Sequence, residues 1–247
     1  TTKAGQVLSW QILNLETGKW VDILYQGSSQ KRSGIPILFP FANPLKNNIL
    51  KYSGKEITQH GFGRNSVWKL GKNTEKIAEI SLNYKDIDQK FQEIYPFKFE
   101  TTIEVELLEH SKIKYTLKVI NLEPEKPLPI APGIHPYFSL LHDFKKNIKA
   151  NLKPDIQDIN WEKNMDGNFR DFPEIAEFGL KDYSLKIYNN KQNMTKNLVI
   201  WSQNKSKEDY DFICLEPFTR DTNGINEDPI WVNKEWKTDW VFKAVLK

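Results

Sequence analysis

Alternating apolar and polar side chains dominate two long runs and predict a β-hairpin. From Phe97 to Leu107, every second residue is apolar or Thr, and Lys, Glu or Thr lies between. Ile113 to Val119 alternates in the same way, with Lys and Thr between. A period of two residues is typical of a strand with one buried face. Residues 109–111 separate the runs, so we expect His110 in the turn and acidic side chains opposite basic ones.

Shorter runs of the same kind extend the pattern along the chain. They cover residues 7–13, 20–25, 50–52, 56–58, 77–84, 185–188, 198–201 and 240–246. Only Asp86 to Ile94 fits a short helix better, with an Asp at its start and Pro96 beyond its end. Many strands at short spacing with polar turns predict an all-β protein, built as a sandwich or barrel with few short helices.

The length and the connections favour one domain. The chain has 247 residues, which suits one large all-β domain or two small ones. Four prolines lie between Leu122 and Pro132, but apolar residues continue on both sides. We interpret this segment as a rigid crossover within one domain rather than a linker, and expect a single domain over residues 1–247.

Composition and charge limit the kinds of binding partner that we expect. The net charge of +3 is spread along the chain, and short runs such as Lys145–Lys146 are interpreted as solvated faces rather than a nucleic-acid surface. No apolar run approaches the ~20 residues that span a bilayer, and no signal peptide is visible. The single cysteine, Cys214, excludes an internal disulfide and lies in an apolar run, so we expect a buried thiol. We therefore expect a cytoplasmic monomer or homodimer without nucleic-acid or membrane partners.

Two of the four histidines lie in distinctive motifs. His60 belongs to Gln-His-Gly-Phe-Gly-Arg, and His135 belongs to Gly-Ile-His-Pro-Tyr-Phe. One carboxylate, Glu216, lies in the apolar sequence Ile-Cys-Leu-Glu-Pro-Phe. Glycine, proline and aromatic neighbours rigidify the backbone and offer flat apolar surfaces. A site that moves protons on a sugar needs such parts, namely an acid, a base and a platform for the ring.

Four motifs in this order resemble the aldose 1-epimerase (galactose mutarotase-like) superfamily, nearer to its hexose-6-phosphate 1-epimerase-related branch. They are the stretches 32–43, 60–64, 133–138 and 215–218, and the resemblance runs from about Arg32 to Asn226. The resemblance implies a large antiparallel β-sandwich with its site in a cleft on one face. It also implies an isomerase that interconverts the α and β anomers of a hexose or hexose 6-phosphate, without a metal or cofactor.

Opening a pyranose requires removing the proton of the C1 hydroxyl and protonating the ring oxygen. A partly buried carboxylate suits the base and an imidazole suits the acid. By resemblance, Glu216 is the base, His135 the acid, and His60 would polarise or position the ring oxygen and its neighbouring hydroxyl. Arg64 would hold sugar hydroxyls or a phosphate, and Arg32 would help to bind a phosphate in a two-arginine clamp.

The sequence also offers candidates for further contacts with the sugar. The aromatic candidates for stacking on the sugar are Trp68, Tyr137 and Phe218, although most aromatic residues serve a core. The resemblance also implies a sugar-binding aspartate, for which Asp182 is the first candidate and Asp166 the second. Galactose mutarotases often carry Arg after the Asn of the first motif, whereas Pro44 follows Asn43 here.

Two other classes of function remain open. A non-catalytic carbohydrate-binding module on the same scaffold would lack one member of the acid–base pair, but both His135 and Glu216 are present. Another carbohydrate-active enzyme, such as a glycosidase, usually needs two carboxylates, and the chain offers one good candidate. A metal enzyme is disfavoured because His60 and His135 lack a convincing third ligand. The sequence leaves the sugar and its phosphorylation undecided.

Overall fold

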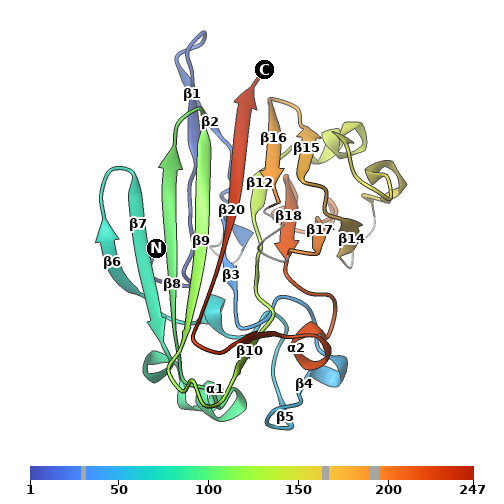
Figure 1. Ribbon diagram of the computed structural model, residues 1–247. Coiled ribbons are helices and arrows are strands. Elements are labelled where there is room, and N and C mark those ends of the chain that lie inside the picture. Colours follow the sequence, from blue (N-terminus) through green and yellow to red (C-terminus); the bar gives the residue numbers. More distant parts are fainter. Residues whose placement is uncertain (29–31, 163–166, 190–194) are drawn as a thin grey trace.

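The chain forms two large antiparallel sheets (Figure 1). The computed structural model describes residues 1–28, 32–162, 167–189 and 195–247. One sheet has eight strands, in the order β13 (Lys149–Ala150), β15 (Ile175–Gly179), β16 (Tyr183–Tyr188), β20 (Glu235–Leu246), β9 (Lys112–Asn121), β8 (Phe99–Leu108), β7 (Ile77–Asn83) and β6 (Lys69–Asn73). The other has six, in the order β14 (Asn168–Asp171), β17 (Asn197–Trp201), β18 (Phe212–Phe218), β11 (Gly133–Ile134) and β3 (Ile37–Leu38), with β12 (Tyr137–Ser139) also paired to β18. The predicted antiparallel β-sandwich is thus confirmed.

The β8–β9 hairpin confirms the clearest sequence pattern. Its register places Glu106 opposite Lys114, whose Nζ lies 2.6 Å from the carboxylate. His110 lies in the turn, is exposed and has a positive φ of 58°. The predicted acidic–basic pairing therefore exists on the outer face of this hairpin.

Helices are few and short. Helix α1 covers Gln89–Ile94, and the preceding residues Tyr84–Asp86 form a 3-10 turn, so the predicted helix is shorter than expected. A second helix, α2 (Gly224–Glu227), was not predicted. No helix in the described ranges is long and apolar enough to cross a membrane.

Within the described residues, three two-stranded sheets accompany the two large ones. They pair β1 (Gln11–Asn14) with β2 (Lys19–Asp22), β4 (Ile49–Leu50) with β5 (Lys55–Glu56), and β10 (Leu128–Ile130) with β19 (Ile230–Val232). Strand β10 lies within the proline-rich segment. This segment connects β9 of the eight-stranded sheet to β11 of the six-stranded sheet, so it crosses between the two sheets.

Strand β18 is buried along its whole length, and its two faces serve different purposes. Ile213 and Leu215 join the main core together with residues of the eight-stranded sheet, such as Trp240. The intervening side chains of Phe212, Cys214, Glu216 and Phe218 point to the opposite face, because successive side chains of a strand alternate. That face carries the candidate site.

The interpretation of Lys145–Lys146 as a solvated pair is wrong for Lys145. Lys146 is exposed, but the side chain of Lys145 is 1% exposed. Its Nζ donates to the carbonyl oxygens of Gln203 and Tyr210 and contacts Nδ1 of His142. Burial lowers the pKa of Lys145 to about 8. The 3-10 turn at His142–Asn147 turns the two neighbouring lysines to different sides, which a linear charge pattern does not reveal.

Candidate active site

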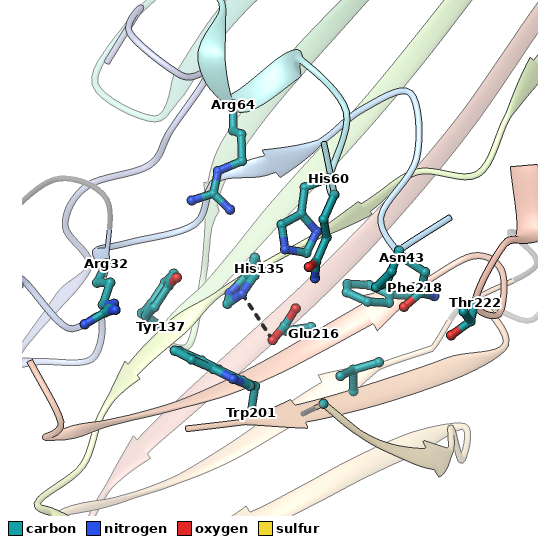
Figure 2. A pocket seen from close by; sticks show the side chains of 14 residues that line it. Arg32, Asn43, His60, Arg64, His135, Tyr137, Trp201, Glu216, Phe218 and Thr222 are labelled. Atoms are coloured by element: carbon teal, nitrogen blue, oxygen red, sulfur yellow. Dashed lines mark ion pairs between the residues drawn. The ribbon is translucent and has the colours of Figure 1, made fainter. Parts of the chain in front are cut away.

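A cavity of about 480 Å³ opens on the outer face of the six-stranded sheet. This volume is in the range of small-molecule sites. Its lining residues are Arg32, Asn43, Pro44, Gln59, His60, Arg64, His135, Tyr137, Gly167, Val199, Trp201, Glu216, Phe218 and Thr222. We call this cavity the cleft; Figure 2 shows its labelled side chains converging from both sides. The structure thus brings together three residues far apart in sequence, His60, His135 and Glu216.

Glu216 and His135 form a buried pair at the floor of the cleft. Nε2 of His135 lies 3.3 Å from Oε1 of Glu216, as the dashed line in Figure 2 marks. The exposed fractions of the residues are 6% for His135 and 2% for Glu216. Burial raises the pKa of Glu216 well above its usual value, against the opposing effect of Arg64. Burial, with the nearby His60 and Arg64, lowers the pKa of His135 well below its usual value.

Aromatic rings hold the imidazole of His135. It stacks on Tyr137, with ring centroids 4.7 Å apart and planes 12° apart. It meets the edge of Trp201 at 5.9 Å. The backbone N–H of His135 donates to the carbonyl of Pro36 on the segment that enters β3. The ring is therefore fixed by packing and by its backbone before any ligand binds.

His60 is presented by a turn with an unusual backbone. Its φ is 74°, a left-handed conformation that few non-glycine residues adopt. Gly61 follows with φ 65°, and a Cβ there would lie 2.4 Å from the carbonyl oxygen of Phe39. Such strained conformations persist where surrounding structure enforces them. Here the turn directs the imidazole toward that of His135, with ring centroids 5.7 Å apart.

The tautomer of His60 follows from its backbone partner. Its Nδ1 contacts the carbonyl oxygen of Ala42, which only accepts hydrogen bonds, so Nδ1 carries the proton. Burial, followed by the charge of Arg64, lowers the pKa of His60 to about 4. At neutral pH the imidazole is therefore uncharged, and its Nε2 accepts a hydrogen bond.

Two guanidinium groups line the cleft, in different settings. Arg64 belongs to the 3-10 turn Gly63–Asn65, reaches into the cleft in Figure 2, and makes no salt bridge with the residues that the structure describes. Arg32 donates from Nη1 to the carbonyl oxygen of Glu208 at 3.2 Å. Hydrogen bonds from Ser28 and Tyr25, and then the charge of Arg32, lower the pKa of Asp209 against the effect of burial. The guanidinium of Arg64 is thus more available to bind a ligand than that of Arg32.

Two predicted contact residues lie outside the cleft. Trp68 is 1% exposed, and its Nε1 donates to the carbonyl oxygen of Gly63, so it supports the turn beneath Arg64 instead of offering a stacking surface. Asp182 is exposed between β15 and β16, both strands of the eight-stranded sheet, whereas the cleft is built on the other sheet. The second aspartate candidate, Asp166, lies outside the described residues. Tyr137 and Phe218 do line the cleft.

Several lining residues were not singled out from the sequence. Trp201 ends an alternating run, and its ring packs against Phe212 at 5.5 Å while its edge meets His135. Asn43 ends the first motif and donates from its side chain to the carbonyl of Arg220. In the sequence, the alternating pattern was the only feature that pointed to Trp201, and the first motif was the only feature that pointed to Asn43. No sequence feature pointed to Thr222.

Comparison with known proteins supports the family resemblance inferred from the motifs. The model of the family "Aldose 1-epimerase" matches residues 5–212. The plasmid-encoded protein LacX of Lactococcus lactis subsp. lactis is 25% identical over 273 residues, covering 93% of this chain and 88% of LacX.

Solved structures share the fold at low sequence identity. The Slr1438 protein of Synechocystis sp. PCC 6803 superposes with a TM-score of 0.75 at 22% identity, covering 100% of this chain and 90% of that one. A galactose mutarotase related enzyme of Lactobacillus acidophilus gives a TM-score of 0.71 at 18% identity, covering 96% and 97% of the two chains. At these identities the likeness establishes the fold alone.

Proposed function

The chain belongs to the aldose 1-epimerase family, and from this premise we propose that it interconverts the α and β anomers of a hexose or hexose 6-phosphate. One observation carries the proposal: a carboxyl and an imidazole lie 3.3 Å apart at the floor of a cleft of hexose-accommodating size. Anomer exchange by ring opening needs one proton acceptor and one proton donor within reach of the same C1–O5 edge. Glu216 and His135 supply both.

The pair performs this task with a single proton between them. In the resting form Glu216 is protonated and His135 is neutral, because burial disfavours both charges. Moving that proton to the imidazole creates a carboxylate and an imidazolium without changing the proton count. In this second form Glu216 removes the C1 hydroxyl proton and His135 protonates the ring oxygen. Closure on the other face of C1 reverses both transfers.

His60 and Arg64 orient the sugar in this scheme. Nε2 of His60 accepts a hydrogen bond, so it binds a hydroxyl rather than donating to the ring oxygen. Arg64 has several N–H donors and no acceptor, so it binds hydroxyl oxygens or a phosphate. Its positive charge also favours the carboxylate form of Glu216, which is the form that takes the C1 proton.

Tyr137, Trp201 and Phe218 provide apolar surface around the pair. All three line the cleft, and aromatic faces suit the C–H surfaces of a pyranose. Asn43, Gln59 and Thr222 supply polar groups on the cleft wall. Trp201 replaces Trp68 in our proposal as the tryptophan that contacts substrate.

The phosphorylated substrate is the finer part of the proposal. Arg32 and Arg64 line the same cleft, and charge-assisted hydrogen bonds to a phosphate are worth about 1.5–3 kcal/mol each. Arg32 already donates to the Glu208 carbonyl, so Arg64 is expected to supply the larger share of the phosphate affinity.

The test is NMR exchange spectroscopy between anomers across a panel of hexoses and hexose 6-phosphates, with wild type and Glu216→Gln compared. We expect enzyme-dependent exchange cross-peaks for at least one sugar, lost in the variant. Binding of a sugar without accelerated exchange would instead indicate a carbohydrate-binding module. Release of a monosaccharide from a glycoside, with no anomer exchange, would indicate a glycosidase.

A further inference from the structure

A third potential metal ligand lies beside the His135–Glu216 pair. Cys214 precedes Glu216 by two residues on β18, so both side chains leave the same face of the strand. One ligand atom each of His135, Cys214 and Glu216 lies within 4.8 Å of the others, and all three residues are buried. No third ligand was evident from the sequence, because Cys214 and His135 are 79 positions apart and meet only where β12 and β11 pair with β18.

The spacing of the His135–Glu216 pair suits a tetrahedral zinc ion, and Cys214, whose Sγ lies within 4.8 Å of both partners, completes the donor set if its thiolate moves closer on binding. With Zn–N and Zn–O distances of about 2.0–2.2 Å, two ligands at a tetrahedral angle lie roughly 3.3–3.6 Å apart. The observed separation of Nε2 and Oε1 is 3.3 Å. Thiolate, imidazole and carboxylate are all common zinc ligands. Because His135 and Glu216 line the cleft, an ion enters from that side and keeps its fourth position open to water or a hydroxyl.

We propose that His135, Cys214 and Glu216 form an inhibitory site for Zn²⁺, in which the ion binds the groups that would otherwise transfer protons. Binding of the metal does not depend on the proposed function, whereas inhibition by the metal rests on the proposed epimerase function. The charge of Arg64 opposes a cation in the cleft, and burial raises the pKa of both Cys214 and Glu216. The ion therefore displaces a proton from each side chain, and the two negative charges so formed offset the charge of Arg64. His60 is not a ligand in this arrangement, because its Nδ1 is bonded to the Ala42 carbonyl.

Cobalt(II), as a spectroscopic substitute for zinc, tests the site directly. Titration of the metal-free protein with Co²⁺ should produce a thiolate-to-cobalt charge-transfer absorption. Added Zn²⁺ should displace the Co²⁺ and remove this absorption. Cys214→Ser should abolish this absorption. His135→Asn and Glu216→Gln should weaken Co²⁺ binding at least ~10-fold, and far-ultraviolet circular dichroism verifies that each variant is folded. His110→Ala is the matched control, because His110 pairs with Glu109 at 3.9 Å on the surface and should leave the titration unchanged.

Anomer exchange separates the two proposals. Zn²⁺ should slow exchange by wild type at least ~10-fold, and a chelator should restore it. Absence of the charge-transfer band in wild type, or its persistence in Cys214→Ser, would overturn the metal site. A protein that shows the band but no exchange without metal would overturn the epimerase assignment and leave the metal site standing. Unchanged exchange under saturating Zn²⁺ would overturn the inhibition.

Discussion

At the scale of single residues, burial decides what the cleft can do. Glu216 and His135 are both almost fully buried, and an isolated charge on either would be costly. Their nearest side-chain atoms lie 3.3 Å apart, and in the proposed mechanism one proton moves between them. His60, fixed as the Nδ1–H tautomer by Ala42, remains an acceptor. Three titratable side chains thus differ in protonation behaviour because their surroundings differ, and the proposed roles follow from that difference.

The acid–base pair yields the first prediction. Glu216→Gln and His135→Asn should each lower kcat for anomer exchange at least ~10²-fold, because a positioned acid or base typically contributes ~10²–10⁴. NMR exchange measures the rate, and circular dichroism monitors the fold. The exposed Glu109→Gln is the control and should keep the wild-type rate. A folded variant of either cleft residue at the wild-type rate would remove that residue from the chemistry.

The lowered pKa of His60 predicts that the protein loses stability in acid. Its pKa is about 4 in the folded state against 6.5 in the unfolded chain. Between these values the His60 imidazole binds more protons in the unfolded state, so its contribution to the free energy of unfolding falls as pH decreases from 6.5 to 4. The expected loss is roughly 2–3 kcal/mol, since one pKa unit corresponds to about 1.4 kcal/mol. Urea unfolding at several pH values measures it.

His60→Asn is the informative variant for this test. Asn tolerates the left-handed backbone of this position better than most residues, so the turn should survive without the imidazole. The pH slope should become shallower by the His60 contribution. The slope that remains combines His135, whose pKa is lowered in the same direction, with Glu216, whose raised pKa acts in the opposite direction. An unchanged slope in folded His60→Asn would contradict the assignment.

At the scale of elements, β18 and its neighbours shape the cleft floor. Gly133 of β11 pairs with Phe218 of β18, and the absence of a side chain at Gly133 lets the Phe218 ring lie over it. A Cβ on Gly133 would approach Phe218 Cδ1 to 2.6 Å and Ala42 Cβ to 3.0 Å. Gly133, in the motif of His135, therefore allows β11 to pack closely against Phe218, in the motif of Glu216.

Gly133→Ala should push Phe218 into the cleft. We expect a loss of about 1–3 kcal/mol in the free energy of unfolding, as for other overpacked sites, together with a raised KM. Gly179→Ala is the matched control within a strand, because its Cβ would have no neighbour closer than 3.8 Å. The control should change stability by less than about 1 kcal/mol. Equal effects of the two substitutions, measured by urea unfolding and by kinetics, would contradict the packing argument.

At the scale of the whole molecule, the cleft joins distant parts of the chain. Its lining runs from Arg32 to Thr222 and includes residues that precede β3 and follow β18. A ligand that contacts these segments binds only the folded state. Its binding energy is therefore added to the stability of the entire fold.

Ligand binding should consequently raise the Tm. A hexose 6-phosphate at about 100 times its Kd adds roughly 2.7 kcal/mol, which corresponds to about 5–10 °C for a chain of this size. Arg64→Ala should remove most of the additional shift that the phosphate confers, and Arg32→Ala a smaller part. Free hexose provides the control for both variants. Equal Tm shifts with phosphorylated and free sugar in wild type would indicate a free-aldose epimerase.

The sequence alone determined the features that depend on neighbouring residues. Period-two alternation defined the β8–β9 hairpin and the antiparallel class, because strand side chains alternate regardless of what packs on them. The motifs also identified His60, His135 and Glu216, which the fold brings into one cleft. The helix before Pro96 was predicted too, although its start was misplaced.

Only the tertiary structure decided what depends on contacts between distant segments. Trp68 and Trp201 are both tryptophans beside strands, yet one supports a turn in the core and the other lines the cleft. Lys145 is buried because carbonyl groups from residues 203 and 210 satisfy its amine. Cys214 approaches His135 only through the pairing of β12 and β11 with β18. Burial and pKa arise from such contacts, which no linear pattern encodes.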